Sequence, residues 1–294
     1  MKGRYLSSTL ALLCLTLFTN CNKPAKPWTP LLDKNLSQWD IFLGIPHKTS
    51  GIPGYEHVEN VNGGYPPLGL GNKKNVFSTF ETHGEVVLKV TGEIYGALIS
   101  KAIFENYHLY FKVKWGEKRW PPRLNATRNN GLLYHSVGEF GGGLWNTWMS
   151  SLEFEVEETN FGDFICIDEP NVTAYCPAIQ KANGKYYFYP NAPLKRLNWK
   201  TEDTGRCFKN EDHEKPFGEW NTVELIAFGN TNIHIVNGKV VNVVYNPQYY
   251  NGNSWEPMLK GKLQFQSEAA ETYFKDIKIK SITHLEKPYK IYLK

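Results

Sequence analysis

Alternation of apolar and polar residues recurs along most of the chain and predicts β-strands. In the clearest segment, residues 107–115, apolar side chains occupy the odd positions and mostly polar ones the even positions. Successive side chains of a strand point to opposite faces, so such a segment offers one face to a core and one to solvent. Further strands are predicted at residues 86–90, 152–157, 222–227, 232–236, 239–245, 263–266 and 273–282.

A tight turn is predicted between the strands at 232–236 and 239–245. The two residues between them are Asn237 and Gly238. Both central positions of this turn type require positive φ, which asparagine and glycine adopt most easily. The dipeptide therefore predicts a β-hairpin.

The strands predict one large all-β domain. They recur from about residue 37 to 282 without a long linker, and no segment shows a sustained helical period. This pattern favours a single antiparallel sandwich over two domains. Polar segments rich in glycine and proline are expected to be loops, and loops on a rigid sheet often carry binding groups. These segments are residues 44–74, 116–130, 137–147 and 168–219.

The segment 152–157 places three carboxylates on one strand face. Its sequence is Leu-Glu-Phe-Glu-Val-Glu, so Glu153, Glu155 and Glu157 alternate with apolar residues. Neighbours on that face are about 6.5–7 Å apart along the strand. Carboxyl pairs that cleave glycosidic bonds lie about 5–9.5 Å apart, so the spacing permits such chemistry. A solvated outer sheet face explains the pattern equally well.

The composition is sufficient for a large core and gives no sign of nucleic-acid binding. The 294 residues are 41% hydrophobic and 14% aromatic, with nine Trp and 17 Tyr. Aromatic residues often line sugar-binding surfaces, although most of them fill ordinary cores. The formal net charge is +4, and the basic residues are scattered. This distribution does not indicate nucleic-acid binding.

Residues 1–20 resemble a bacterial lipoprotein signal peptide. A short basic start precedes an apolar run that is too short to span a bilayer as a helix, and Cys21 follows. In such signals the cysteine becomes the lipidated first residue. We expect a tether at residues 21–28, a folded domain at residues 29–294, and a lipid-anchored protein of the bacterial cell envelope, in the periplasm or at the cell surface. Ordinary secretion is the alternative.

The remaining cysteines leave two alternatives open. Cys166, Cys176 and Cys207 follow Cys21, and no C-x-x-C pattern is present. One disulfide, most simply Cys166–Cys176, would suit an oxidising compartment. Three separate structural cysteines explain the sequence equally well.

An ordered set of short motifs resembles the 3-keto-disaccharide hydrolase family. The resemblance spans about Trp28 to Ile282, and Lys34 departs from it where a glycine is expected in a turn. No single motif is decisive, but their order and spacing are specific. The motifs are G-E-I-Y-G from Gly92, W-P-P-R ending at Arg123, N-N-G-L-L-Y-H ending at His135, L-E-F-E-V-E from Leu152, and G-K-L-Q-F-Q-S-E ending at Glu268.

The resemblance implies a concanavalin A-like jelly-roll fold and an oxidised carbohydrate substrate, a disaccharide or glycoside with a ketone at C3 of one sugar. That ketone acidifies the C2 proton, so a base can form an enolate, the C1 substituent leaves, and water adds. The reaction needs a base near C2, a cation or donor at the enolate oxygen, and an acid for the leaving group.

The resemblance points to Glu153 as the best catalytic candidate, with His135 and Glu155 beside it. Like charges on the same face oppose ionisation, so neighbouring carboxylates are expected to raise the pKa of Glu153. His135 is a candidate acid, base or metal ligand, although a lone histidine is often only a hydrogen-bonding group. Further candidates for substrate binding are Tyr95, Lys114, Arg123, Asn130, Glu157, Gln266 and Glu268.

A divalent metal and two rival functions stay open. Glu153, Glu155 and His135 have suitable ligand atoms for a metal, but their spacing does not require one. The glutamate strand also resembles the Glu-x-Asp-x-Glu strand of jelly-roll endo-glucanases, with glutamate at the central position here. A non-catalytic carbohydrate-binding lipoprotein is the second rival. The discriminating observation is whether Glu153 and His135 point into one pocket.

Overall fold

A computed structural model describes residues 27–202 and 204–294 of the chain. The predicted signal peptide, the lipidation site Cys21 and most of the predicted tether lie outside these residues. Helical structure in the described part is confined to 3₁₀ segments at Lys48–Ser50, Lys73–Asn75, Leu144–Asn146 and Lys287–Tyr292. None of the described helices has the length and hydrophobicity that a membrane span requires.

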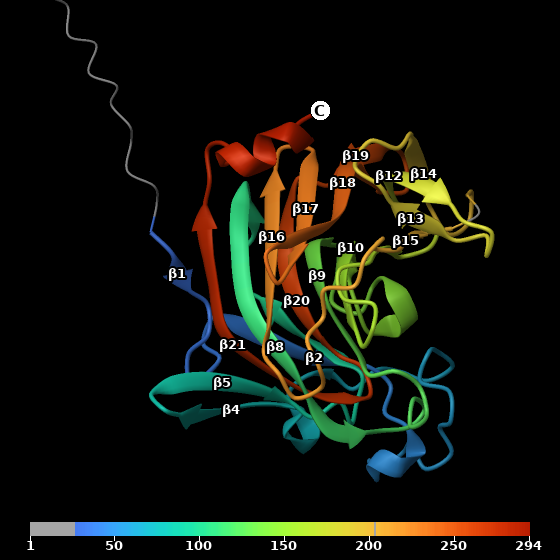
Figure 1. The fold of residues 1–294 in the computed structure, drawn as a ribbon. Helices are drawn as coiled ribbons and strands as arrows, with labels where there is room; N and C mark the ends of the chain where they lie inside the picture. Colours follow the sequence, from blue (N-terminus) through green and yellow to red (C-terminus); the bar gives the residue numbers. More distant parts are fainter. Residues whose placement is uncertain (1–26, 203) are drawn as a thin grey trace, which may run out of the picture.

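Two antiparallel sheets form the body of the protein (Figure 1). The first sheet has the strand order β13-β12-β18-β17-β16-β8-β21-β5-β4, with β1, β14 and β19 beside β21, β12 and β18. Its strands are β1 (Thr29–Pro30), β4 (Phe77–Thr82), β5 (Glu85–Val90), β8 (Tyr107–Arg119), β12 (Val172–Gln180), β13 (Tyr186–Phe188), β14 (Leu194–Leu197), β16 (Asn221–Phe228), β17 (Thr231–Val236), β18 (Lys239–Tyr250), β19 (Trp255–Pro257) and β21 (Ala270–Ser281).

The second sheet has the order β15-β11-β10-β9-β20-β6-β2-β3, with β7 beside β20. Its strands are β2 (Trp39–Leu43), β3 (Gly69–Leu70), β6 (Gly96–Ser100), β7 (Phe104–Glu105), β9 (Asn129–Val137), β10 (Ser150–Glu157), β11 (Phe164–Ile167), β15 (Arg206–Cys207) and β20 (Lys260–Ser267). Together the two sheets confirm the predicted all-β, concanavalin A-like jelly-roll sandwich. Each strand predicted from alternation is present.

The core lies between the sheets and is built from the apolar positions of that alternation. Phe265 of β20 packs against Phe111 and Phe274 of the first sheet, with both pairs of ring centroids 5.1 Å apart. All three side chains are fully buried. Burial of such rings supplies the main driving force for bringing the two sheets together. The polar residues of the same strands therefore lie on the two outer faces of the sandwich.

The predicted hairpin is confirmed. Asn237 and Gly238 join β17 to β18 with φ angles of 49° and 77°. Asn237 also fixes the turn to the neighbouring strand, because its side-chain oxygen accepts a hydrogen bond from the Thr222 backbone N–H at 2.8 Å. The conformational tolerance of these two residues thus positions two long strands of the first sheet.

Residues 168–219 were predicted as a loop, and this prediction is wrong. The segment contains β12, β13, β14 and β15. The first seven residues of β12, from Val172 to Ala178, are almost all buried. Because both faces of the strand are covered, its sequence lacks the alternation of apolar and polar residues that identified the other strands. Pro177 lies in the middle of β12 and pairs there with Leu194 of the short strand β14, although proline is uncommon inside a paired strand.

The structure also bears on the predictions for the cysteines and for the tether. Cys166, Cys176 and Cys207 are buried and free, so the alternative with separate cysteines describes the fold. Trp28 is the last residue of the predicted tether. It nevertheless packs on the first sheet against His108 and Tyr110, with ring centroids 5.0 and 6.1 Å away.

Candidate active site

The glutamate strand β10 lies in the middle of the second sheet, between β9 and β11. Its apolar residues Leu152, Phe154 and Val156 are fully buried in the core between the sheets. Glu153, Glu155 and Glu157 therefore project from the outer face of the sheet. They are not solvated, since Glu153 is 4% exposed and Glu155 is 2% exposed. Loops and neighbouring strands cover this face and exclude the reading of an open, wet sheet surface.

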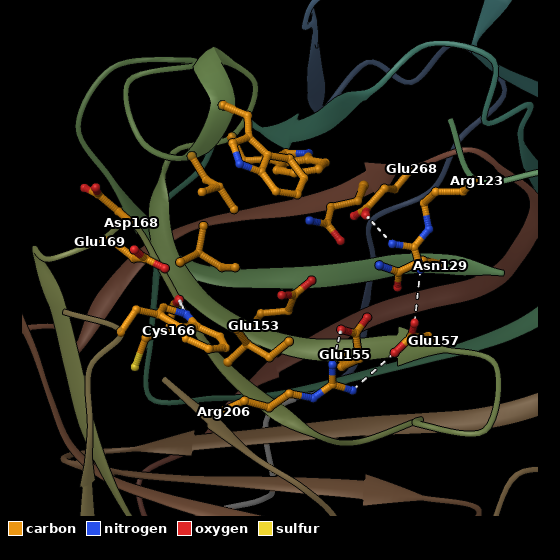
Figure 2. A pocket seen from close by; sticks show the side chains of 17 residues that line it. Arg123, Asn129, Glu153, Glu155, Glu157, Cys166, Asp168, Glu169, Arg206 and Glu268 are labelled. Carbon is orange, nitrogen blue, oxygen red and sulfur yellow. Dashed lines mark hydrogen bonds and ion pairs between the residues drawn. The ribbon is translucent and has the colours of Figure 1, made fainter. Parts of the chain in front are cut away.

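A pocket of about 270 Å³ lies over these glutamates (Figure 2). Its acidic part includes the three β10 carboxylates and Glu268, which follows β20, and the carboxylates of Asp168 and Glu169 also line it. Two cations, Arg123 and Arg206, enter from segments that precede β9 and form β15. The remaining lining is partly apolar and includes Leu144, Trp145, Trp148, Ile165, Ile167 and Trp199.

Ion pairs link the two arginines through Glu157. One oxygen of Glu157 lies 3.1 Å from Arg123 Nη2, and the other lies 3.2 Å from Arg206 Nη2. Arg206 also contacts the buried Asp163 at 2.6 Å, and Arg123 reaches Glu268 at 3.4 Å. Figure 2 shows Glu157 between both guanidinium groups. The charges of Asp163, Arg206, Glu157, Arg123 and Glu268 thus form one alternating chain along the edge of the pocket.

Four donors occupy the Glu157 carboxylate. Thr127 and Asn160 each donate to one of its oxygens at 2.8 Å, in addition to the two arginines. Burial raises the pKa of Glu157, but these hydrogen bonds and the Arg206 charge outweigh burial and lower it. Glu157 is therefore an ionised anchor for the arginines. It is not suited to the role of proton donor that the endo-glucanase reading requires.

Glu153, Glu155 and Glu268 keep their protons more readily than ordinary carboxyls. Burial raises the pKa of Glu153 well above its usual range, and the charge of Glu268 raises it further against the lowering effect of Arg206. Burial, followed by the charge of Glu153, raises the pKa of Glu155 in the same way. Burial also raises the pKa of Glu268 to about 7, although Arg123 lowers it. The pocket therefore holds one carboxyl, Glu268, that exchanges its proton near neutral pH, beside two others whose pKa values are also raised.

Gly131 makes room for two of these side chains. It lies opposite Glu155 in β9, and a Cβ atom at this position would stand 2.2 Å from Glu153 Oε1 and 2.2 Å from Gln266 Oε1. Its φ angle is not positive, so space rather than backbone conformation requires the glycine. The Gln266 oxygen is buried and has no hydrogen-bond partner.

An aromatic wall closes another side of the pocket. Trp145 and Trp148 line it, with ring centroids 5.5 Å apart, and Tyr95 stacks on both from behind at 6.4 and 5.8 Å. Trp148 is fixed by a hydrogen bond from its ring N–H to the Gly96 carbonyl at 2.9 Å. Flat, apolar ring faces next to convergent polar groups are a common arrangement for binding a sugar ring.

Six residues singled out from sequence meet in this pocket, namely Glu153, Glu155, Glu157, Arg123, Gln266 and Glu268. The alternation of Gln266 and Glu268 away from the core residues Leu263 and Phe265 places them on the same face as the glutamates. Tyr95 does not line the pocket but supports its aromatic wall. The catalytic and binding roles of these residues stay predictions.

The prediction that His135 shares a site with Glu153 is wrong. His135 is buried, its Nδ1 lies 2.7 Å from the Met258 carbonyl, and its ring packs on Tyr107 of the first sheet at 5.8 Å. Simple alternation along β9 would have placed it beside Gly131 and Leu133. His135 instead has φ 50°, next to an irregularity in the pairing with β10, and this turns its side chain into the core. A mechanism that needs His135 is therefore excluded by its position. The shared pocket that would separate an enzyme from a carbohydrate-binding protein is absent, so an enzyme mechanism has to rest on the carboxyls and arginines of the pocket alone.

Asn130 and Lys114 are also placed away from the pocket. Asn130 is fully buried, donates to Thr272 of the first sheet, and accepts a hydrogen bond from the Glu268 backbone N–H at 2.7 Å. Its neighbour Asn129 lines the pocket instead, because successive strand residues face opposite sides. Lys114 lies on β8, on the outer face of the first sheet.

Several lining residues were not found from sequence. Arg206 and Trp199 lie in the region read as a loop, where no strand pattern indicated their direction. Asp163, which holds Arg206 from outside the lining, was not found either. Trp145 and Trp148 lie in the glycine-rich segment before β10, and nothing distinguished them from core tryptophans. A usable signal was present only for Asn129, which has the same parity along β9 as Gly131.

No metal centre is assembled by the residues that the structure describes. Within them, no group of three or more His, Cys, Asp and Glu side chains is placed to hold a metal ion. The ligand set considered from sequence is divided, because Glu153 and Glu155 face the pocket whereas His135 faces the core.

Comparisons with known proteins identify a family. The family model described as the 3-keto-alpha-glucoside-1,2-lyase-like domain matches residues 27–280. No curated protein matches the chain. Two solved structures of candidate glycosyl hydrolases from Parabacteroides distasonis resemble it at 19% and 17% identity, with TM-scores of 0.46 and 0.43. Each covers 87% of this chain, which corresponds to 100% and 94% of the respective relative. LamAcat from Zobellia galactanivorans resembles it at 12% identity and a TM-score of 0.41, over 87% of this chain and 93% of the other.

Replacement of Gly131 by alanine should displace Glu153 and Gln266, because the new methyl group overlaps both side-chain oxygens. We expect a loss of about 1–3 kcal/mol in the free energy of unfolding, as for other overpacked sites. Denaturant unfolding and a crystal structure of Gly131→Ala measure the two effects. Gly142→Ala, at a glycine that also lacks positive φ and meets no atom closer than 3.2 Å, is the control. Unmoved side chains in Gly131→Ala would contradict the steric argument.

Glu268 should make the folded state less stable as pH rises. Its folded pKa of about 7 exceeds the ordinary value of 4.5, so the folded state binds more protons than the unfolded state between these values. The free energy of unfolding, relative to a Glu268→Gln variant, should therefore fall by up to roughly 3 kcal/mol between pH 4.5 and 8. Parallel denaturant titrations across this range measure the difference. A constant difference between the two proteins would show that Glu268 titrates normally.

Proposed function

Because the chain belongs to the 3-keto-alpha-glucoside-1,2-lyase-like family, we propose that it cleaves the glycosidic bond of a 3-keto-disaccharide or 3-keto-glycoside. One observation carries the proposal: three buried carboxyls with raised pKa values share a pocket with two arginines. Elimination next to a ketone needs a base, an acid and a cation for the enolate. This pocket contains candidates for all three.

Glu268 is proposed as the base that takes the C2 proton. Its pKa of about 7 matches neutral pH, at which a general base is most effective. The electrons of the C2–H bond then form an enolate with oxygen at C3. Arg123, which already contacts Glu268 at 3.4 Å, and Arg206 on the other side of Glu157 provide positive charge for that oxygen. Glu157 keeps both guanidinium groups in place during this step.

Glu153 is proposed as the acid that protonates the leaving oxygen at C1. It holds its proton to higher pH than an ordinary carboxyl, because burial and the Glu268 charge raise its pKa. When Glu268 takes the C2 proton, that charge disappears and the pKa of Glu153 falls. Glu153 therefore becomes a stronger acid at the moment when the C1–O bond breaks. Water then adds at C1 with return of a proton to C2, so the two carboxyls exchange roles and the overall reaction is hydrolysis.

The 3-keto group should decide whether a substrate is cleaved. We expect the protein to release both sugars from a 3-keto-disaccharide and to leave its unoxidised parent intact, because only the ketone acidifies the C2 proton. Product analysis by mass spectrometry, with and without added divalent metal, measures the outcome. Cleavage of the parent would instead indicate an ordinary glycosidase. Binding of either compound without cleavage would indicate a carbohydrate-binding protein, the second reading of this fold.

The two carboxyls should differ in their dependence on the leaving group. Glu153→Gln should slow release of a sugar alcohol by about 10²–10⁴-fold but act much less on a nitrophenolate, which needs no protonation. Glu268→Gln should slow both substrates, because each requires C2 proton removal. Rates with a 3-keto-glucoside of each leaving group, together with exchange of the C2 proton in deuterated water, separate the roles. Equal losses for both leaving groups in Glu153→Gln would remove its role as acid.

A further inference from the structure

A second hollow, of about 480 Å³, lies on the outer face of the first sheet. Its lining comes from β4, β5, β8 and β21, with Trp220 just before β16. Lys114 and Tyr273 alternate along their strands with Val113 and Phe274, which are buried in the core. The hollow and the candidate active site therefore open on opposite faces of the sandwich. The aromatic side chains around it are Phe80, Trp220 and Tyr273.

Two lysines are held over these rings. Lys114 Nζ lies 5.1 Å from the Trp220 ring centroid and 5.5 Å from that of Tyr273. Lys275 Nζ lies 4.8 Å from the Trp220 ring and pairs with Glu85 at 2.6 Å. Lys114 has no carboxylate partner within residues 27–202 and 204–294. The hollow therefore carries positive charge that its own carboxylate does not neutralise.

The register of the strands increases this charge. Lys112 of β8 lies directly opposite Lys275 of β21, on the same outer face as Lys114. Directly opposed like charges destabilise an antiparallel pair. Among the described residues Lys112 makes no close ion pair, although its charge, after the hydrogen bond and charge of Lys275, helps to lower the pKa of Glu85. A bound anion would offset this repulsion, and half-buried lysines on a ring platform are already oriented for it.

We propose that this hollow binds a sugar residue that carries a carboxylate, such as a uronate of an acidic glycan. The apolar face of the sugar ring would lie on Trp220 and Tyr273, and the carboxylate would lie between Lys114 and Lys275. A concave site with flat rings suits a sugar ring better than a lipid surface, which needs no hollow. This function goes beyond the proposed cleavage reaction, because it concerns a separate hollow on the opposite face of the sandwich.

Calorimetric titration of the full chain with trigalacturonate, and with maltotriose as the neutral trisaccharide, tests the proposal. We expect the wild-type protein to bind trigalacturonate and to bind maltotriose at least tenfold more weakly. Lys114→Met and Trp220→Leu should each weaken binding of trigalacturonate by about tenfold or more, as expected for loss of a contact to a charged group. Lys239→Met, which removes an exposed lysine from the β17–β18 hairpin, should bind as the wild type does.

Three results would overturn the proposal. They are absence of trigalacturonate binding at millimolar concentration, equal binding by Lys114→Met and the wild type, and binding only to vesicles that contain phosphatidylglycerol. The test is independent of the cleavage reaction. Glu153→Gln should retain trigalacturonate binding, and Lys114→Met should retain cleavage of a 3-keto-disaccharide, so failure of one proposal is distinguishable from failure of the other.

Discussion

The bridge from Glu157 to two arginines is the interaction on which the candidate active site depends. Arg123 comes from the segment before β9 and Arg206 from the short strand β15, so no local structure brings them together. Glu157, at the end of β10, contacts one with each oxygen. Burial of two guanidinium groups without such partners would cost several kcal/mol each. The bridge therefore fixes both cations beside the neighbouring carboxyls and leaves those carboxyls without strong ion pairs of their own.

This arrangement creates an excess of acid groups. Five carboxyls, Asp163, Glu153, Glu155, Glu157 and Glu268, surround two arginines. Asp163 and Glu157 make the closest contacts with the arginines. The other three carboxyls are therefore less stabilised by the arginine charges. They cannot all ionise in a buried space, so their pKa values rise. The proposed proton transfer in this pocket thus depends on unequal sharing of charge, and even spacing of glutamates along β10 would not produce it alone.

The sequence predicted the strands and one sheet face well, because alternation directly reports which side chains leave the core. Alternation predicted that Glu153 leaves the apolar side of its strand and that Gln266 and Glu268 leave the apolar side of theirs, but only the order of strands in the sheet puts the three on one face. It failed where backbone irregularity or tertiary pairing decides direction. A positive φ at His135 turns its ring into the core, and Arg206 becomes part of the site only through long-range pairing of β15 with β11. Lys114 has the right parity for an outer face but belongs to the other sheet.

A sandwich with two polar outer faces allows each face to carry a different chemistry. On both faces, the outward-facing residues alternate along their strands with residues of the one core. The packed core therefore fixes the positions of these residues but takes no part in their chemistry. Carboxyls dominate one face and lysines on aromatic rings dominate the other. The two hollows open on opposite faces, so an acidic glycan bound at one would not occupy the pocket in which proton transfer is proposed. Attachment through a uronate on one face and cleavage of a neutral keto sugar on the other are therefore compatible within one domain.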